Sequence, residues 1–414
     1  MNYQEAVDYI HSLLKFGIKP GLERISALLN ALSNPQNDLK YIHIAGTNGK
    51  GSTSTMISEI LSCEGKKVGL FTSPYVFDFC ERIKVNGENI PQNELAKTVA
   101  TVKNAVNSIL KDGIEPTEFE VITACAILYF KETKCDIAVL EVGLGGRFDS
   151  TNIIPPPIAS IITSISLDHT QILGDTVEQI AMEKCGIIKN SSKIITTSRQ
   201  DEKALKIIKE TANNKECDLY IGKVQDAEIL NENIFGTDFL FDGLKIHLPL
   251  VGSHQVENAI GVITCIKAIG GISDKSIVCG IEKTKIPARM EIIEKSPTVL
   301  IDGGHNEECS VALSDMLKRF VRSKITVVIG MMADKDCEHY LKNVLPLCDA
   351  VILTNPSNPR AISPNELEKI AKKYCDNITI EENPKKAFKM AKDITKKEDM
   401  VLVCGSFYLL SDIF

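Results

Sequence analysis

The stretch HIAGTNGKGST, residues 43–53, constrains the fold of this chain more than any other feature. It overlaps an apolar run, YIHIAG, that is typical of a buried strand, and it leads into a helical pattern. Glycines at positions 46, 49 and 51 allow backbone N–H groups to approach an anion closely, and the start of a helix adds its dipole. A strand, a glycine loop and a helix in this order predict a phosphate-binding site in an α/β fold.

The loop does not have the usual G-x-x-x-x-G-K-[ST] spacing, because Gly46 and Gly49 are too close and Gly51 separates Lys50 from Ser52. Its chemistry still suits a nucleoside triphosphate. Lys50 is expected to pair with the β and γ phosphates, and Ser52 or Thr53 offers a hydroxyl to Mg²⁺.

Two series of short apolar runs alternate with helical patterns, which predicts α/β architecture with mostly parallel sheets. The 414 residues favour two domains. We expect an N-terminal P-loop ATPase domain over residues 1–295 and a smaller C-terminal Rossmann-like α/β domain over 296–414. The predicted strands are residues 41–46, 68–73, 136–143 and 158–166, and then 298–304, 325–331, 350–355 and 400–405.

Composition narrows the possible partners. The chain is 44% hydrophobic and 24% charged with a net charge of −7, and it has no basic cluster, so nucleic acid is not an expected partner. The N-terminus reads as an amphipathic helix and no segment approaches the ~18 apolar residues of a membrane span. The thirteen cysteines include no C-x-x-C pair and are expected to be reduced thiols. We therefore expect a cytoplasmic protein that does not bind a membrane.

Polar residues follow several predicted strands, at the edge where ligands bind in open α/β sheets. Glu141 ends the run IAVLE and resembles the carboxylate that helps to hold Mg²⁺ beside a phosphate loop. A solvated strand-end glutamate is the alternative. Ser73 and His169 are further strand-end candidates, and Asp168 next to His169 strengthens the second of them.

Lys184 lies in GDTVEQIAMEKCGIIK, residues 174–189, where Thr176 and Gln179 have capping-box spacing. It falls on the same stripe as Ile180 and Ala181. Burial of a lysine favours the neutral amine, which reacts with CO₂ to form a carbamate, an anionic metal ligand. A snorkelling lysine, with its charge in water, is the alternative.

Other residues carry weaker signals. Thr117 and Glu120 have capping-box spacing before an apolar helix, which explains them without a ligand. Asn258 lies within an amphipathic helix. Arg289 precedes the expected domain boundary, where it can reach a phosphate, and DGGHN, residues 302–306, is either a ligand-binding turn or a structural one.

Taken together, these segments resemble the folylpolyglutamate synthase/dihydrofolate synthase family of the Mur ligase superfamily. The resemblance runs from about residue 15 to the C-terminus, with its motifs in the family's order. They are FGIKPGLERI (16–25), IHIAGTNGKGSTS (42–54), FTSPY and ERI (71–83), TEFE (117–120), EVGLGGRFDSTN (141–152), SISLDHTQILGDT (164–176), EKCGIIK (183–189), HQVENA (254–259), PARME (287–291), DGGHN (302–306) and DKD (334–336).

The resemblance implies an ATP-dependent amide ligase. A carboxylate of folate or dihydropteroate attacks the γ-phosphate of ATP, and the amino group of L-glutamate then attacks the acyl phosphate and expels phosphate. It also implies two Mg²⁺ sites, ATP as co-substrate between the two domains, and a monomer. Dependence on a monovalent cation stays open, as does the choice between the first glutamate, later ones, or both.

The resemblance also implies roles for individual residues. The first domain would hold the pteroate or folate, and the second would be the glutamate ligase domain. By motif, the nucleotide would be bound by Thr47, Asn48, Gly49, Lys50, Gly51, Ser52, Asn258, Arg289 and Asp302. The metal would be bound by Ser73, Glu141, His169 and carbamylated Lys184, and the folate by Thr117, Glu118, Phe119 and Phe148. Catalysis would use Lys50, Lys184 and His305.

Two departures and two alternatives accompany this prediction. Tyr75 stands where the family commonly has histidine, which leaves the contacts of residues 73–82 open, and Gly304 replaces an alanine, which is expected to matter little. One alternative is a Mur-type ligase that acts on a peptidoglycan precursor. The other is a P-loop nucleotide-binding protein without ligase chemistry, although such a protein has no need of Lys184 or DGGHN.

Overall fold

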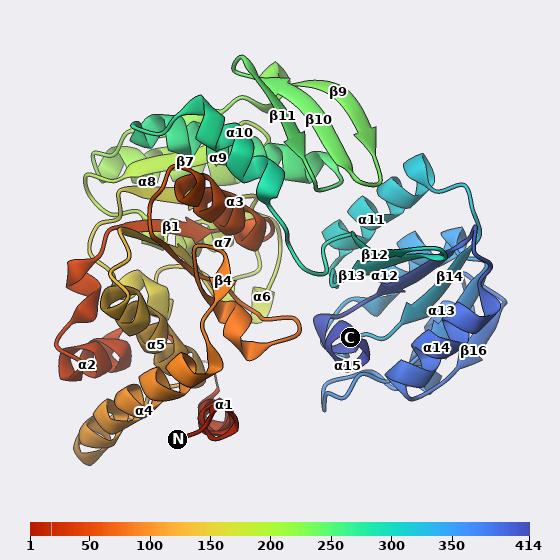
Figure 1. Ribbon diagram of the computed structural model, residues 1–414, viewed down its shortest axis with the longest axis horizontal. Coiled ribbons are helices and arrows are strands. Elements are labelled where there is room, and N and C mark those ends of the chain that lie inside the picture. Colours follow the sequence, from red (N-terminus) through yellow and green to blue (C-terminus); the bar gives the residue numbers. More distant parts are fainter. Residues whose placement is uncertain (18) are drawn as a thin grey trace. The chain divides into compact units, whose positions relative to one another are not determined.

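The computed structural model describes residues 1–17 and 19–414, so position 18 of the motif FGIKPGLERI lies outside it. The described chain divides into two compact units. The first comprises Met1–Leu230, Asp238–Leu248 and Ser253–Thr284, and the second comprises Asn231–Thr237, Pro249–Gly252 and Lys285–Phe414. Each unit is built around its own mostly parallel sheet, which confirms the predicted fold class (Figure 1).

The sheet of the first unit has the order β4-β3-β2-β5-β1-β6-β7-β8. Strands β2, β5, β1, β6, β7 and β8 run parallel, and β3 and β4 extend the sheet as antiparallel strands. The phosphate loop therefore leaves the carboxyl end of a central strand, between two parallel neighbours. The strands are β1 (Tyr41–Ala45), β2 (Val68–Phe71), β3 (Ile83–Val85), β4 (Glu88–Asn89), β5 (Ile137–Glu141), β6 (Ala159–Ile162), β7 (Lys193–Thr197) and β8 (Leu219–Gly222).

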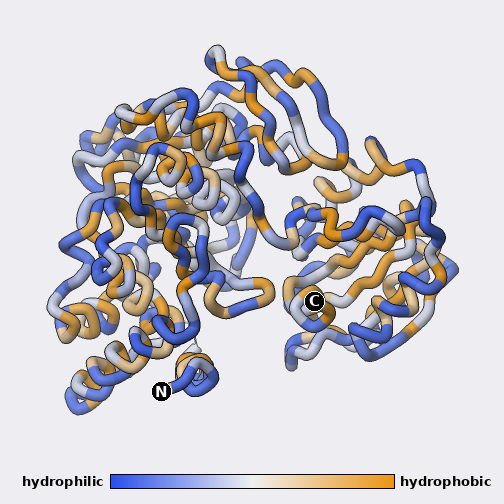
Figure 2. Tube along the Cα trace, in the orientation of Figure 1, coloured by the Kyte–Doolittle hydropathy of each residue, from blue (hydrophilic) through white to orange (hydrophobic). Residues whose placement is uncertain are grey.

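Strands β1, β2, β5 and β6 are mostly apolar and buried along their whole length because helices cover both faces of the sheet (Figure 2). Tyr41 and Ala45 face the side packed by α1, α2, α4, α5, α7 and α8, whereas α3, α9 and α10 lie on the other side (Figure 1). The helices of this unit are α1 (Tyr3–Ser12), α2 (Glu23–Ala31), α3 (Lys50–Cys63), α4 (Gln92–Ile109), α5 (Glu118–Glu132), α6 (Thr170–Leu173), α7 (Val177–Lys184), α8 (Glu202–Asn214), α9 (Ser253–Ile269) and α10 (Asp274–Lys283).

Short 3₁₀ helices join several of these elements. Both predicted capping boxes are present, since Thr176 and Gln179 cap α7 and Thr117 and Glu120 cap α5 reciprocally. The 3₁₀ helices are η1 (Leu13–Phe16), η2 (Pro35–Asp38), η3 (Phe79–Arg82), η4 (Leu110–Asp112), η5 (Ser150–Ile153), η6 (Cys185–Ile187), η7 (Val224–Asp226) and η8 (Leu345–Leu347).

The second unit has a sheet of order β12-β13-β17-β14-β15-β16, parallel except for β12. Its buried core includes Leu313, Val327 and Leu402. The elements are β12 (Glu291–Lys295), β13 (Thr298–Asp302), β14 (Ile325–Ile329), β15 (Ala350–Leu353), β16 (Ile378–Ile380) and β17 (Met400–Cys404), with α11 (Glu307–Phe320), α12 (Cys337–Val344), α13 (Pro364–Ala371), α14 (Pro384–Ile394) and α15 (Phe407–Ile413).

The second unit begins earlier than the expected boundary between residues 295 and 296. Residues Glu291–Lys295 form β12, which pairs antiparallel with β13, so the hydrogen bonds of this segment belong to the second sheet. Strand β12 is joined to β13 by a short turn and not by a helix. The alternation of strands and helices that was used to place the boundary therefore did not reveal β12. Three further strands, β9 (Glu228–Asn233), β10 (Gly236–Phe241) and β11 (Leu244–Leu248), form a separate sheet that was not predicted.

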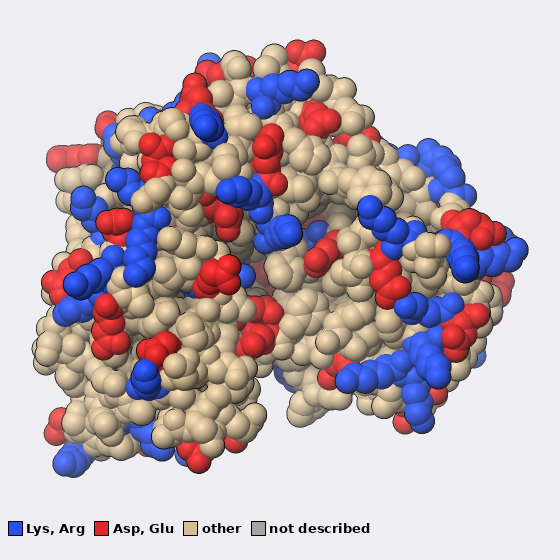
Figure 3. All heavy atoms as spheres, in the orientation of Figure 1, with Lys and Arg blue, Asp and Glu red and all other residues tan. Residues whose placement is uncertain are grey.

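Surface charge is mixed on the face drawn in Figure 3, where Lys and Arg lie among Asp and Glu. Over the part of the chain that the structure describes, no helix is long and apolar enough to cross a membrane.

Candidate active site

The phosphate loop is held in place by glycine and by contacts with neighbouring segments. Gly49 caps α3 in the left-handed region, at φ 82°. A Cβ there would lie 2.4 Å from Asn258 Oδ1, so glycine lets α9 approach the loop. The Thr47 hydroxyl donates to Ser166 O and accepts from Ser166 N, both at 3.1 Å. The close approach at Gly49 places Asn258, predicted from the resemblance alone, beside the loop.

Lys50 folds back over the loop that precedes it. Its Nζ donates to Gly46 O at 3.1 Å and to Thr47 O at 2.9 Å. The ammonium is thus kept beside the N–H groups at the start of α3, where the helix dipole already favours an anion. This arrangement puts a positive charge where a phosphate would lie.

Glu141 ends β5 next to the start of α3. The carboxylate accepts a hydrogen bond from Ser73 N at 3.0 Å, and a Cβ on Gly51 would lie 3.5 Å from Glu141 Oε2. Glu141 is 5% exposed. The structure thereby brings together Glu141, Ser73 and the phosphate loop, three of the predicted metal and phosphate positions.

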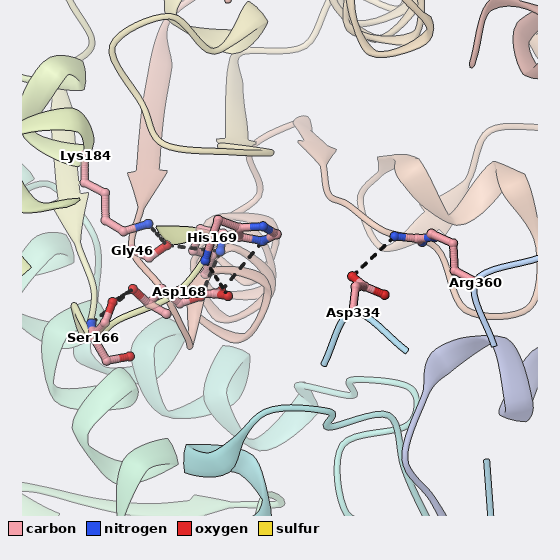
Figure 4. Close-up of polar contacts among 9 residues, drawn as sticks. Gly46, Ser166, Asp168, His169, Lys184, Asp334 and Arg360 are labelled. Carbon is pink, nitrogen blue, oxygen red and sulfur yellow. Dashed lines mark hydrogen bonds and ion pairs between the residues drawn. The ribbon is translucent and has the colours of Figure 1, made fainter. Parts of the chain in front are cut away.

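Lys184, at the end of α7, is 4% exposed, so a snorkelling lysine is excluded. Its Nζ donates to Gly46 O at 2.7 Å, as Figure 4 shows. Burial, helped by the charge of Lys50, lowers the pKa of Lys184 to about 7, while Asp168 and Asp149 oppose the shift. A substantial fraction of this lysine is therefore the neutral amine near neutral pH.

His169 occupies a strained backbone conformation beside the same loop. Its φ is 49°, in a left-handed region that residues other than glycine rarely adopt. Its Nε2 lies 3.7 Å from Asp168 Oδ2, and its backbone N donates to Asp168 Oδ1 at 2.9 Å (Figure 4). Such strain is concentrated at functional sites, which agrees with the choice of His169 as a candidate.

A buried hydrogen-bond network joins His43, Thr151 and Asp149, none of which was predicted as a site residue. Asp149 accepts hydrogen bonds from Leu144 N at 2.9 Å and from the Thr151 hydroxyl at 2.5 Å. Because that hydroxyl donates to Asp149, it accepts from His43 Nε2, 2.8 Å away. Burial raises the pKa of Asp149 and lowers that of His43 to about 3. The network fixes the loop that follows Glu141, and the pattern D-S-T after GLGGRF was its only signal in the sequence.

The start of α5 forms an aromatic and charged cluster. Phe119 packs against Phe71, with ring centroids 5.8 Å apart, and a Cβ on Gly143 would lie 2.5 Å from the Phe119 ring. Glu118 pairs with Arg82 at 3.5 Å, and Thr117 caps the helix. These three consecutive predicted folate residues thus lie at the start of α5, with Phe71 and Arg82 as neighbours.

Phe148, the fourth predicted folate residue, is 51% exposed in the loop after β5. The Arg82 guanidinium stacks over the rings of Tyr75 at 5.4 Å and Phe79 at 5.3 Å. Arg82 lies within the motif 71–83 but was not predicted as a site residue, because its ion-pair partner, Glu118, lies in a segment that only the fold brings close.

The second unit contributes its own cluster at the carboxyl end of β13. Asp302 is 4% exposed and accepts from Met290 N at 3.0 Å and Gly304 N at 2.9 Å. Burial raises the pKa of Asp302, and the charge of Arg289 opposes this shift. The ring of Phe407, another residue that was not predicted, lies 4.9 Å from the Arg289 guanidinium and 6.2 Å from the His305 ring. Arg289 and His305 thus lie near the ring of Phe407, and the charge of Arg289 also acts on the buried carboxyl of Asp302.

Arg360 marks a further polar cluster in the same unit. It lies 3.6 Å from Asp334 Oδ2, an ion pair drawn in Figure 4, and donates to the Tyr408 hydroxyl at 3.1 Å. Arg360 is more than half exposed. Its guanidinium is therefore accessible to an anion.

Gly304 has a steric role that the sequence did not indicate. A Cβ there would lie 2.5 Å from Asp302 Oδ1 and 2.7 Å from Cys309 Cβ, so these contacts predict that an alanine would crowd both side chains. We expect Gly304→Ala to lower the free energy of unfolding by about 2 kcal/mol through overpacking. Urea denaturation measures this change. In a double-mutant cycle Cys309→Gly should recover part of the loss, and additive effects would contradict the steric explanation.

Comparisons with known proteins agree with this geometry. Residues 44–266 match the Mur ligase middle domain, and residues 288–407 match the Mur ligase, glutamate ligase domain. Dihydrofolate synthase/folylpolyglutamate synthase from Bacillus subtilis is 38% identical over 427 aligned residues, which cover 99% of this chain and 98% of that protein.

Two solved structures have the same fold. The crystal structure of folylpolyglutamate synthase from Thermotoga maritima has a TM-score of 0.88 and 36% identity, over 99% of this chain and 95% of that one. Escherichia coli FolC in complex with DHPP and ADP has a TM-score of 0.87 and 29% identity, over 99% and 96%.

The chain therefore belongs to the dihydrofolate synthase/folylpolyglutamate synthase family of Mur ligases. The predicted family and the predicted class of enzyme, an ATP-dependent ligase, are both confirmed.

Proposed function

We propose that this chain adds L-glutamate to a folate, and also to dihydropteroate, through an acyl phosphate. The carboxylate of the acceptor attacks the γ-phosphorus of ATP and ADP leaves. The glutamate amine then attacks the acyl carbon, loses a proton and expels phosphate. The observation that carries the proposal is the grouping of Lys50, Glu141 and the buried Lys184 at the phosphate loop. Bacillus subtilis and E. coli relatives are named for both activities.

ATP is the co-substrate in this proposal. Residues Thr47–Ser52 would hold its phosphates, with Asn258 beside Gly49. We propose Arg289 and Asp302 as further nucleotide contacts, and the Arg289 guanidinium lies 4.9 Å from the Phe407 ring. Relatives from E. coli and Mycobacterium tuberculosis have been solved with ADP or AMPPCP, which supports this assignment.

Mg²⁺ fits the donor set around Glu141. The carboxylate of Glu141 and the hydroxyls of Ser73 and Ser52 are the hard oxygen ligands that this ion prefers. We propose that they hold one Mg²⁺ and that His169 and Lys184 serve a second. Bound there, the ion would neutralise charge on the phosphates of ATP.

Lys184 would contribute as a carbamate. Its neutral amine, favoured by burial, reacts with CO₂ to give a carbamate and a proton, which replaces a buried cation by an anion.

His305 would face the glutamate or the acyl phosphate. Arg360, with its accessible guanidinium, is suited to a carboxylate of glutamate.

The start of α5 would bind the pteroyl group. Phe119 and the half-exposed Phe148 offer aromatic faces to a flat ring, and Thr117 and Glu118 offer polar groups.

We expect Tyr75→His to weaken the stack of Arg82 on Tyr75 and Phe79 and to raise the KM for the folate about three-fold. Steady-state kinetics should show the KM for ATP unchanged. A change in the KM for ATP alone would contradict a role for this loop in folate binding.

We also propose a monomer in the cytoplasm. All thirteen cysteines are free thiols, as expected in a reducing compartment. The partners would be small molecules, namely ATP, L-glutamate and a folate or dihydropteroate.

The decisive experiment measures ADP release with MgATP and glutamate, using dihydropteroate and tetrahydrofolate as separate acceptors, with products identified by mass. Glutamate added to both acceptors is the expected result. Addition to tetrahydrofolate alone would restrict the enzyme to chain extension. ADP release that depends on a peptidoglycan precursor, with no glutamate on either folate, would overturn the folate assignment.

A further inference from the structure

Two cysteines far apart in the sequence meet at the surface of the first unit, away from the site described above. Cys63 is the last residue of α3, and Cys279 lies in α10. Their sulfur atoms are 2.8 Å apart, although 216 positions separate them in the chain. Because a disulfide bond is about 2.05 Å long, a small movement of the side chains would bring these sulfurs to bonding distance.

The packing of the two helices fixes this approach. A Cβ on Gly280 would lie 2.4 Å from the backbone N and Cα of Ile60, so α10 lies directly against the backbone of α3. One turn further along, Glu64 accepts from Ser273 N at 2.9 Å and from its hydroxyl at 2.8 Å. The two thiols are therefore held close to each other by contacts on either side of them.

The thiols are reachable and have an exposed cation beside them. Both cysteines are partly exposed. Lys283, one turn after Cys279, hydrogen-bonds its sulfur, and both sulfurs raise the pKa of Lys283. Burial and the neighbouring Cys279 raise the pKa of Cys63 to about 11. A metal site is not favoured, because among the residues that the structure describes no three His, Cys, Asp or Glu side chains are grouped to hold an ion.

We propose that Cys63 and Cys279 are a thiol–disulfide pair that a low-molecular-weight disulfide oxidises. The Cys279 thiolate, next to Lys283, attacks one sulfur of the small disulfide and releases one thiolate. The Cys63 thiolate then attacks the Cys279 sulfur of the mixed disulfide and releases the second. Two protein thiols are oxidised to one disulfide, one small disulfide is reduced to two thiols, and the protons of Cys63 and Cys279 go to the released thiolates.

The cross-link would join the helix that begins at Lys50 to the helix that precedes the end of the first unit at Thr284. A disulfide that closes a long loop restricts the unfolded chain, so the oxidised protein is the more stable form. None of the residues assigned above to ATP, metal or folate takes part. The inference is therefore independent of the proposed function.

The test uses the full-length, reduced protein incubated with glutathione disulfide. We expect the intact mass to fall by about 2 Da, a non-reduced digest to contain the peptides of Cys63 and Cys279 joined, and the Tm to rise by about 5 °C. Dithiothreitol should reverse all three changes. Cys63→Ser and Cys279→Ser should each prevent them.

Cys217→Ser is the matched control, because Cys217 is also partly exposed but bonds a backbone carbonyl, Lys189 O, at 3.1 Å. It should form the cross-link as the parent chain does. Glutathione left attached to either cysteine without a joined peptide would overturn the proposal, as would a Tm that does not change when the cross-link forms. The digest of the unaltered chain gives this answer even if a serine variant fails to fold.

Discussion

Replacing Lys184 by methionine is expected to give a protein that is more stable and inactive. Burial lowers the pKa of Lys184 from 10.5 to about 7, so folding at neutral pH removes a charged amine from water at a cost. Methionine fills a similar volume without that cost but loses the hydrogen bond to Gly46 O. We expect the free energy of unfolding at pH 7 to rise by about 2–4 kcal/mol. This is less than the full pKa shift implies, because the lost hydrogen bond to Gly46 O offsets part of the gain.

The gain should depend on pH with a definite sign. Between pH 7 and 10.5 the unfolded chain binds more protons at Lys184 than the folded one, so the penalty in the parent protein lessens as pH rises. The advantage of Lys184→Met is therefore largest at pH 7 and below and shrinks towards pH 10. Urea denaturation at pH 6, 8 and 10 measures this. An equal difference at all three values would show that the pKa of Lys184 is not lowered.

Activity should fall at least about 1,000-fold in the same variant, because the site loses its anionic carbamate. ADP release in the presence of glutamate and tetrahydrofolate measures the loss. Lys189→Met is the matched control, since Lys189 is partly buried, with a pKa that burial lowers to about 8, but bonds the carbonyls of Asn152 and Ile154. That variant should retain most of the activity. In the parent protein activity should decline below pH 7 as the amine becomes protonated, and bicarbonate should restore part of it.

Glu141→Gln is expected to cost about 100- to 1,000-fold in ADP release, with a higher Mg²⁺ concentration needed for half-maximal rate. The amide keeps an oxygen that accepts from Ser73 N, so the fold should be retained. What is lost is the negative charge beside Gly51 and the phosphate loop. Titration of the rate with Mg²⁺ gives both quantities.

A second charge-neutralising variant serves as the comparison for Glu141→Gln. Glu183→Gln removes a carboxylate next to Lys184 in sequence, but this carboxylate pairs with Arg147 at 3.3 Å. It should leave the Mg²⁺ dependence unchanged. If both variants, or neither, altered that dependence, Glu141 would not be a metal ligand.

The sequence predicted much of the fold because buried parallel strands are continuous apolar runs, and all eight expected strands are present. It did not predict β12 or the β9–β11 sheet, since short antiparallel strands with exposed residues lack that pattern. Lys184 could be predicted to be buried from its place on an apolar stripe. The roles of Arg82 and Phe407 could not, because the Glu118 partner of Arg82 and the Arg289 and His305 partners of Phe407 come from distant segments. The left-handed backbone at His169 likewise leaves no trace in residue types.

The division of the chain into units has a consequence for making each part separately. The second unit includes Asn231–Thr237 and Pro249–Gly252, which are synthesised well before the rest of it. Val251 is part of its buried core, and Ile234 packs against that core. A fragment that starts at Lys285 would therefore expose apolar surface, and a ribosome must finish most of the chain before these two segments find their partners. The part of the chain from Lys285 onward is therefore not a detachable module, because Asn231–Thr237 and Pro249–Gly252 complete its unit.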